Sequence, residues 1–388
     1  MKKLTCVSLF SGCGGMDLGA IQAGFSIEYA IDSELIAVET YKANIGNHIV
    51  CGDVGDCNLQ SLGKNLDLLI GGPPCQGFSS AGPKRIHDPR NKLWEEYLRF
   101  VKQLRPGICI LENVMGFRRE LPEFIASLEK NTAGAYRVFH RPIITQFYGV
   151  PQWRHRLFVV CVRKDIGDTF VWPKSDVAEK YDFNLWQPGL VTLQDALQDL
   201  GPPSKEASDK LDHTCIPLNE VDGEIASHIP NGGSLKDIPD RYLPAPYKGR
   251  ARGKKGWTWY YRKPRPHLPG RSVIASTRPN YATILAPDVN YLRIGSDWKW
   301  EPVDAGPHTS KSGLYTSPTP QRRLTIRECA RLQTFPDSFL FKGTLMQKHK
   351  MIGNAVPIEF ARRLCCAAAH LIEHGDEVAD RSAQGELF

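Results

Sequence analysis

Runs of apolar residues alternate with amphipathic stretches over the first 160 residues of the chain. Residues 4–10 have the pattern of a buried strand, and residues 16–24, after a glycine-rich turn, have the spacing of a helix that ends at Gly24. Further strands are predicted at 27–31, 66–70, 108–111, 136–144 and 156–162, and further helices at 33–44, 92–104 and 119–130. Strands that alternate with helices predict an α/β fold with a doubly wound, mostly parallel sheet.

This rhythm stops after about Val162. The chain is then rich in Pro, Gly, Trp and Tyr until about residue 321, which predicts a second, smaller domain, and helical spacing returns at 324–334 and 356–373. A length of 388 residues agrees with two lobes. We therefore expect a first domain at 1–180, a second at 181–325, a C-terminal part at 326–375 whose helix 356–373 returns to the first domain, and a tail at 376–388.

Composition narrows the class of protein. Apolar residues make up 41% of the chain and charged residues 23%, which is typical of a globular protein. No apolar run approaches the ~20 residues of a membrane span, so we expect a soluble, cytoplasmic protein. The eleven cysteines include no C-x-x-C pair, and we therefore expect neither a structural metal nor disulfides.

Positive charge is concentrated in one window of the second domain. Residues 241–287 contain eleven Lys or Arg and no Asp or Glu; removing these eleven from the total of 49 bases leaves 38, against 42 acids. The whole positive excess of the chain therefore lies in this window, which indicates a polyanionic partner. A basic stretch of this kind is also found on ordinary solvated surfaces.

The turn after the first strand suits a nucleotide-like cofactor. Its glycines allow a tight turn and a close approach to a ligand, and the helix that follows presents its N-terminal amides. Asp32, at the end of the second strand, is placed to accept hydrogen bonds from ribose hydroxyls, and Asp53 from an adenine amine. A nicotinamide site is less favoured, because the G-x-G-x-x-G fingerprint would need glycine in place of Asp17. Glycine-rich turns without ligands, and aspartates that only cap helices, are the alternatives.

Two reactive side chains follow later strands. Cys75 stands in a Pro-Pro-Cys turn directly after the strand 66–70, and Glu112 ends the strand 108–111. Because ligands bind at the carboxyl ends of strands in sheets of this type, we expect both side chains at one crevice. A buried cysteine is more often an inert apolar residue, and this remains the alternative for Cys75 taken alone.

Six motifs in order give the chain a resemblance that runs nearly end to end. They are SLFSGCGG, GGPPCQGFS, LENV, QFYGVPQWRHRLFVV, RRLTIRECARLQTFPDSF and MIGNAVP. The sequence resembles the carbon-5 cytosine DNA methyltransferases, in particular those of bacterial restriction-modification systems. The resemblance implies the Rossmann-like methyltransferase fold, S-adenosyl-L-methionine as cofactor and double-stranded DNA as substrate, with activity as a restriction-modification or orphan methylase.

The resemblance also implies a mechanism. Cys75 matches the cysteine that adds to carbon-6 of cytosine, and Glu112 the acid that contacts the ring nitrogen and the exocyclic amine. Arg154 and Arg156 match two arginines, one near the thiolate and one toward the ring carbonyl. Water is a candidate for the base that removes the carbon-5 proton. The cytosine must leave the duplex to be attacked, because stacking hides its ring face.

The same resemblance implies a cofactor pocket. The matching residues are Phe10, Ser11, Gly12, Cys13, Gly14, Gly15, Asp32, Ser33, Asp53, Val54, Pro74, Leu93, Asn354 and Ala355. Three residues in or beside this pocket depart from the family. Ser8, in the strand before the turn, stands where Asp is frequent. Asp32 is one carbon shorter than the usual Glu, and Ser33 stands where a tryptophan can pack on the adenine. These departures bear on the affinity for the cofactor.

DNA contacts are predicted in two regions. The loop 79–91 would close over DNA, and the insert between QWRHR and RRLTIRECARLQ would be the target-recognition region, ending near a Thr-containing element. The residues expected to contact DNA are Ser79, Lys84, Arg85, Arg90, Lys248, Arg250, Arg252, Lys254, Lys255 and Thr283.

Three other functions stay open at this point. An RNA cytosine methyltransferase that acts on transfer RNA has the same fold, and a DNA-binding regulator would keep the fold without catalysis. A nicotinamide oxidoreductase is the most distant alternative. As a methylase, the protein would act as a monomer at the nucleoid, without a metal, beside any cognate endonuclease encoded separately.

Overall fold

The computed structural model describes residues 3–63, 66–74, 93–180, 182, 186–205, 211–243, 261–275, 285–303 and 315–378. The chain forms two compact units. Unit 1 comprises Met1–Tyr148, Arg154–Asp176 and Ala355–Phe388, and unit 2 comprises Gly149–Trp153 and Val177–Asn354. The expected first domain, 1–180, differs from unit 1 at 149–153 and 177–180, which belong to unit 2.

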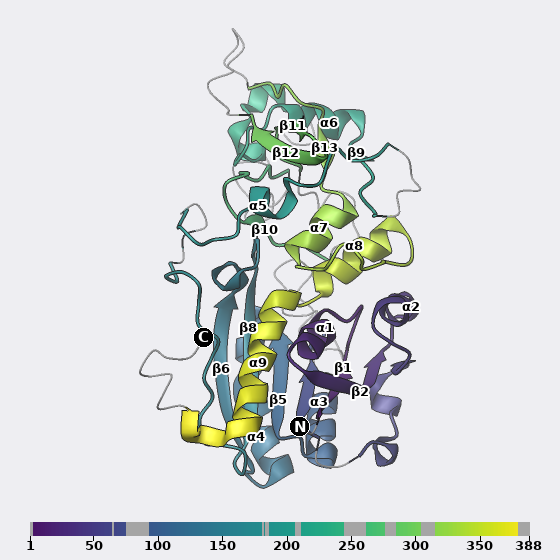
Figure 1. Ribbon diagram of the computed structural model, residues 1–388, viewed down its shortest axis with the longest axis vertical. Coiled ribbons are helices and arrows are strands. Elements are labelled where there is room, and N and C mark those ends of the chain that lie inside the picture. Colours follow the sequence, from purple (N-terminus) through teal and green to yellow (C-terminus); the bar gives the residue numbers. More distant parts are fainter. Residues whose placement is uncertain are drawn as a thin grey trace. The chain divides into compact units, whose positions relative to one another are not determined.

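Unit 1 is built on a seven-stranded sheet with the strand order β3-β2-β1-β4-β5-β8-β6 (Figure 1). Neighbouring strands from β3 to β5 are parallel, and β8 is antiparallel to both β5 and β6. The predicted α/β fold with a parallel-dominated sheet is thus confirmed. The strands are β1 (Leu4–Leu9), β2 (Phe25–Asp32), β3 (Ile49–Cys51), β4 (Leu68–Gly71), β5 (Ile108–Asn113), β6 (Tyr136–Ile144) and β8 (His155–Arg163).

Helices cover both faces of this sheet. Helices α3 and α4 lie on one face, and α1, α2 and α9 on the other (Figure 1). Helix α3 buries Trp94, Tyr97, Leu98 and Val101, whose spacing of three and four residues forms one apolar stripe. The helices are α1 (Gly15–Gln22), α2 (Leu35–Asn44), α3 (Leu93–Leu104), α4 (Leu121–Thr132) and α9 (Ile358–His374).

The first and last helices of unit 1 pack in close contact. A Cβ atom at Gly19 of α1 would lie 2.5 Å from the Cβ of Ala361 in α9, and one at Gly15 would lie 2.7 Å from the carbonyl oxygen of Val356. Real side chains essentially never approach that closely, so both positions require glycine. The predicted helix 356–373 therefore belongs to the same body as the first strand.

Unit 2 has short elements. Strand β7 (Gln152–Trp153) pairs with β10 (Gly270–Arg271), β9 (Ile216–Pro217) with β13 (Arg322–Arg323), and β11 (Val289–Ile294) with β12 (Asp297–Pro302). Its helices are α5 (Leu193–Leu197), α6 (Glu220–Ser227), α7 (Ile326–Leu332) and α8 (Leu345–Asn354). The sequence pattern did not predict α8.

The RRLTIRE segment is a structural element of unit 2. Thr325 and Glu328 form a capping box at the start of α7, and the Glu328 carboxylate also accepts two hydrogen bonds of 2.7 Å from the Arg322 guanidinium. The buried Arg327 donates to the carbonyl oxygens of Leu211, Pro336 and Phe339. These charged residues thus stabilise the backbone around α7.

Among the residues that the structure describes, no helix is long and apolar enough to cross a membrane.

Candidate active site

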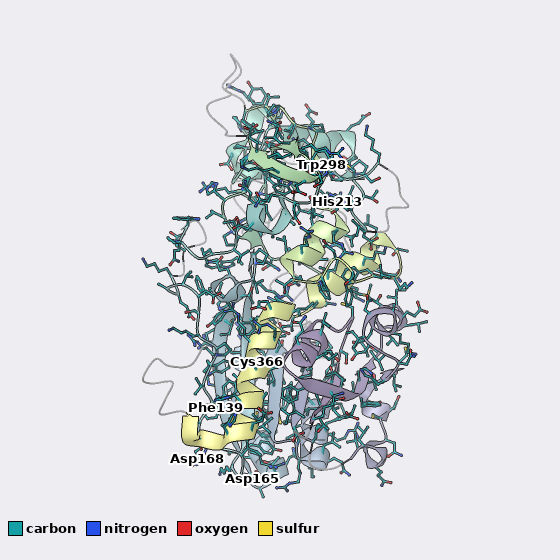
Figure 2. The ribbon with its side chains drawn as sticks, viewed as in Figure 1. Phe139, Asp165, Asp168, His213, Trp298 and Cys366 are labelled. Carbon is teal, nitrogen blue, oxygen red and sulfur yellow. The ribbon has the colours of Figure 1, made fainter. Side chains whose placement is uncertain are left out.

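The candidate site lies at one edge of the sheet of unit 1. The carboxyl ends of β1 to β5 share this edge because these strands are parallel, and the antiparallel β8 begins there, since Leu157 pairs with Asn113. The ion pairs Arg163–Asp165 and Arg137–Asp168 lie at the opposite edge, where β8 ends (Figure 2). Sheets of this type bind ligands at the carboxyl edge.

The glycine-rich turn is fastened to the end of β2. The Asp32 carboxylate accepts hydrogen bonds from the backbone nitrogens of Gly12 (2.8 Å) and Glu34 (2.9 Å). Phe10 and Gly12 both have left-handed backbones, with φ of 54° and 55°, and no atom lies within 4 Å of a Cβ built on Gly12. The turn therefore has open space beside a carboxylate, which suits a ligand with hydroxyl groups.

Behind this turn lies a buried carboxylate that the sequence did not single out as functional. Asp17 accepts hydrogen bonds from the Ser8 hydroxyl (2.9 Å) and the Tyr41 hydroxyl (3.0 Å). The Ser11 hydroxyl lies 2.9 Å from that of Ser8. In the sequence Asp17 is only a mismatch to the dinucleotide fingerprint, because spacing alone does not show which side chains meet beneath a turn.

The remaining predicted cofactor residues of unit 1 lie around the same edge. Asp53 is exposed and caps a 3-10 turn by accepting a hydrogen bond from the Gly55 nitrogen (2.7 Å). Val54, next to it, is buried, whereas Ser33 is exposed. Cys13 is buried, and burial raises the pKa of its thiol to about 12. Ala355 lies against Gly15, where a built Cβ would be 3.1 Å from the alanine Cβ.

Three other members of the predicted set stand at element boundaries. Pro74 is the last described residue of the turn after β4, and Leu93 begins α3. Asn354 ends α8 and belongs to unit 2. Gly14 has φ of 92°, and a Cβ there would meet the Ile45 and Tyr41 side chains.

Glu112 and Arg156 meet across β5 and β8. The Arg156 Nε lies 3.0 Å from the Glu112 Oε1, and the side chains are 20% and 11% exposed respectively. The partial exposure leaves both groups accessible to a ligand at the edge. The resemblance assigned both residues to one catalytic set, and the structure brings them into direct contact.

Two residues not in the predicted site hold the turn after β4 against Glu112. The Asn113 side-chain nitrogen donates a hydrogen bond of 3.0 Å to the Pro73 carbonyl oxygen. A Cβ built on Gly72 would lie 3.3 Å from the Glu112 Oε2. The described part of the Pro-Pro-Cys turn therefore lies directly against the Glu112 carboxylate. Asn113 is part of the LENV motif, but the motif alone does not show that its side chain contacts Pro73.

Arg154 is almost fully buried, unlike Arg156. Burial lowers the pKa of the Arg154 guanidinium well below its usual value, the nearby charge of Arg156 lowers it further, and Glu112 opposes the shift. Arg154, Arg156 and Glu112 are thus electrostatically linked in one group.

The predicted nucleophile and the predicted DNA contacts lie outside the described residues. These are Cys75, Ser79, Lys84, Arg85, Arg90, Lys248, Arg250, Arg252, Lys254, Lys255 and Thr283.

One base of the acid-free window has an internal role in unit 2. The Lys263 ammonium lies 2.9 Å from an oxygen of Asp288, and both side chains are buried. Tyr315, Ser317 and Thr319 donate further hydrogen bonds of 2.7 to 2.8 Å to the same carboxylate. Lys263 therefore does not face a polyanion, and the window is less uniformly a binding surface than its composition suggested.

The comparisons with known proteins identify the class of enzyme. The family model of C-5 cytosine-specific DNA methylases matches residues 4–369, and the chain belongs to that family. It is therefore a DNA (cytosine-5-)-methyltransferase.

Its relatives are Type II methyltransferases of restriction-modification systems. The chain is 31% identical to M.FnuDI of Fusobacterium nucleatum over 394 residues, which cover 98% of this chain and 99% of the relative. It is 32% identical to M.NgoPII of Neisseria gonorrhoeae over 373 residues, covering 95% and 96% respectively.

Solved structures share the fold. The Entamoeba histolytica methyltransferase EhMeth has a TM-score of 0.60 at 15% identity, with 98% of this chain and 99% of that chain covered. The S. pombe Dnmt2 methyltransferase has a TM-score of 0.61 at 17% identity, with 94% of this chain and 98% of that chain covered.

Proposed function

We propose that the protein methylates carbon-5 of a cytosine flipped out of a specific short duplex sequence, through a covalent adduct with Cys75. The observation that supports this most directly is the contact between the turn that leads to Cys75 and Glu112. Gly72 and Pro73 lie against Glu112 and Asn113, so a base bound beside Glu112 would also lie beside this turn.

The first step is nucleophilic. The Cys75 thiolate adds to carbon-6 of cytosine, and the electron pair of the carbon-5 to carbon-6 double bond moves toward the ring nitrogen N3. Glu112 delivers a proton to N3 and holds the exocyclic amine, so no full negative charge develops on the ring. The 11% exposure of Glu112 allows this contact and keeps most water away.

The two arginines supply fixed positive charge. Arg156, in contact with Glu112, would orient the carboxyl group toward the base and bind the ring carbonyl oxygen. The buried Arg154 would raise the proportion of thiolate at Cys75, since a cation nearby favours the charged form of a thiol.

S-adenosyl-L-methionine, when bound, supplies an activated methyl group that the electron-rich carbon-5 accepts. The residues of the edge fit this cofactor, because the Asp32 carboxylate stands beside open space at Gly12 and Asp53 keeps one carboxylate oxygen clear of the Gly55 hydrogen bond. Asp32 would bind the ribose hydroxyls, and Asp53 the adenine amine. A base, for which water suffices, then removes the carbon-5 proton and the Cys75 thiolate leaves.

Unit 2 would recognise the DNA sequence. We assign target recognition to 181–325, with the predicted basic contacts on phosphates, and closure over the flipped base to the loop 79–91. We further propose that the protein acts as a monomer and that any cognate endonuclease is a separate protein.

Covalent trapping tests the mechanism. Incubated with S-adenosylmethionine and a duplex that contains 5-fluorocytosine in its target, the protein should form a stable adduct, because fluorine cannot be removed as a cation from carbon-5. The adduct should be absent with Cys75→Ala. A Cys75→Ala protein that still methylates DNA, measured with tritiated cofactor, overturns the proposal.

The substrate is tested separately. Bisulfite sequencing of DNA from cells that express the protein should show methylcytosine at one short sequence, and tritium should enter duplex DNA and not transfer RNA. Incorporation into RNA alone would contradict the assignment. Exchange of residues 190–320 with those of a relative should transfer the target, and an active chimera that keeps its original target would contradict the role of unit 2.

A further inference from the structure

A chain of hydrogen bonds runs from the glycine-rich turn through the interior of unit 1. The Ser11 hydroxyl lies 2.9 Å from the Ser8 hydroxyl, which lies 2.9 Å from an oxygen of Asp17. The other oxygen of Asp17 lies 3.0 Å from the Tyr41 hydroxyl, which lies 2.9 Å from the His48 Nε2. The chain thus joins a residue of the turn to the half-buried imidazole of His48, which follows α2 in the sequence.

The direction of these hydrogen bonds depends on the charge of Asp17. When Asp17 is ionised, it accepts from both Ser8 and Tyr41, and the Ser8 oxygen is left to accept from Ser11. When Asp17 is protonated, one of its oxygens must donate, so either Tyr41 or Ser8 has to reverse. Tyr41 can reverse by donating to His48. A reversal at Ser8 would instead make its hydroxyl donate to Ser11, whose own proton would then turn to the Ser8 carbonyl oxygen at 3.2 Å. The ionised form therefore imposes one direction on the hydrogen bond between Ser11 and Ser8, and the protonated form allows both directions.

The surroundings of Asp17 place this change near neutral pH. Asp17 is fully buried, and burial raises the pKa of its carboxyl group to about 7, although the hydrogen bonds from Ser8 and Tyr41 oppose the shift and Asp32 adds to it. The other titratable groups that face it belong to β1, the turn, α2 and α9, and they are Cys6, Cys13, Tyr41 and Cys365. Burial raises the pKa of each of these groups, so all four stay protonated near pH 7. Figure 2 labels Cys366, the residue that follows Cys365 in α9.

His48, at the outer end, does not replace Asp17 as the titrating group. Burial lowers the pKa of His48, and the charge of Glu28 only partly opposes this shift. The imidazole is therefore neutral where Asp17 changes its charge. It accepts a hydrogen bond from Tyr41 or donates one to it, according to its tautomer.

We propose that Asp17 is the positioning residue of the cofactor turn: its carboxylate, acting through Ser8, holds Ser11 and the adjoining Gly12 in the conformation that binds S-adenosylmethionine. The inference rests on the proposed function, since it requires the cofactor to bind at this turn. Asp17 does not touch the ligand. Asp32 fastens the turn from one side, and the Ser8 and Asp17 pair fastens it from the other.

Calorimetric titration with S-adenosylmethionine at pH 6 and pH 8, on the full chain, tests the proposal. Asp17→Asn keeps the size of the side chain, but its amide has only one oxygen and cannot accept hydrogen bonds from both Ser8 and Tyr41 through separate oxygens. At pH 8 it should bind the cofactor roughly tenfold more weakly than the wild type, as expected when a hydrogen bond to a charged group is lost. At pH 6, where the wild-type carboxyl group is largely protonated, the two proteins should bind alike.

Unfolding measurements separate positioning from a general loss of structure. The raised pKa means that the ionised carboxyl group opposes folding, so Asp17→Asn should be at least as stable as the wild type at pH 8. The control is Asp67→Asn, since Asp67 accepts from Thr5 at the other end of β1. That variant should bind S-adenosylmethionine as the wild type does at both pH values.

Ser8→Ala provides a second test, because it cuts the link to Ser11 and leaves Tyr41 in place. It should weaken binding at pH 8 and remove most of its pH dependence. The role of Asp17 is overturned if the affinity of Asp17→Asn relative to the wild type is the same at pH 6 and pH 8. It is also overturned if the variant loses affinity and stability in parallel. A wild type that binds no S-adenosylmethionine at either pH would instead overturn the proposed function and, with it, this inference.

Discussion

The Asn113 side chain donates a hydrogen bond of 3.0 Å to the carbonyl oxygen of Pro73. This contact joins the end of β5, which carries Glu112, to the turn after β4, which leads to Cys75. In the proposed mechanism Cys75 and Glu112 act on one ring, and this hydrogen bond would hold the turn that precedes Cys75 close to the acid. A misplacement of about 1 Å in such a pair costs on the order of 100-fold in rate.

Replacement of Asn113 should slow the chemical step. Asn113→Ala leaves the Pro73 carbonyl oxygen without this donor, at a cost of about 1–3 kcal/mol, and we expect adduct formation with 5-fluorocytosine DNA to slow by roughly tenfold or more. Affinity for S-adenosylmethionine should not change. Asn44→Ala is the matched control, because it also removes an amide-to-carbonyl hydrogen bond, to Thr40 within α2, and should leave the rate of adduct formation intact.

A methyl group at position 72 should disturb Glu112. The added Cβ would lie 3.3 Å from the Glu112 Oε2, tight enough to displace the carboxylate by a few tenths of an ångström. We expect Gly72→Ala to lower kcat by about tenfold, with little change in melting temperature. Gly63→Ala, where nothing lies within 4 Å of the new atom, should behave as wild type. Equal activity of the two variants would show that the position of Glu112 is not critical.

Neutralisation of Glu112 should reduce methylation far more than it reduces stability. Glu112→Gln removes the proton donor, and loss of general acid catalysis typically costs about 10²–10⁴ in rate. Tritium transfer to DNA should therefore fall much more than the calorimetric affinity for the cofactor. The comparison variant is Glu96→Gln, which breaks a half-exposed pair with Arg99 (2.7 Å) and should change both readouts little.

How far the sequence predicts this protein differs between its two units. Six strands of the unit 1 sheet were predicted to within about two residues, because buried strands have nearly uninterrupted apolar runs. The three-residue strand β3 (Ile49–Cys51) was not predicted, since it is too short to show a pattern. Unit 2 gave few such signals, because strands of two residues such as β7 and β13 have no period, and α8 begins with Leu345 and Met346 on an exposed face.

The candidate site divides in the same way. Glu112 was predicted from a strand end and Arg156 from motif order, and the structure shows the two side chains in contact. Asn113 and Asp17 were not assigned roles, since a hydrogen bond to a carbonyl oxygen or to two hydroxyl groups depends on register and packing that no single stretch of sequence contains. The roles of all these residues remain predictions for the experiments above.

The buried pair of Lys263 and Asp288 should dominate the stability of unit 2. Burial lowers the pKa of Lys263, and Asp288 partly opposes this shift. Lys263→Met leaves the Asp288 carboxylate buried without its cation, which should reduce the free energy of unfolding by about 3 kcal/mol, the lower end for such pairs, since hydroxyl donors remain. Chemical denaturation measures the change. Lys299→Met, at an exposed position of β12, should have an effect below about 0.5 kcal/mol.

Glu328 should contribute to the loss of stability in acid. Burial acts to raise the pKa of Glu328, but the charge and hydrogen bonds of Arg322 outweigh it and hold the pKa below its usual value of 4.5. The folded state therefore binds fewer protons than the unfolded state, so this stabilisation is complete above about pH 4.5 and disappears as the pH falls through the folded pKa. Glu328→Gln should be less stable than wild type at pH 7, and the difference should shrink toward pH 3 in thermal unfolding.

The packing of α1 against α9 has a consequence for biosynthesis. Gly15 and Gly19 contact Val356 and Ala361, so the layer that supports the first turn of the protein contains residues more than 330 positions away. A nascent polypeptide emerging from the ribosome has β1 and its turn available early, but it lacks their covering helix until almost the entire message has been translated. Unit 1 thus completes its assembly after unit 2 has been synthesised, and methylating capacity should appear only in chains that have been read through α9.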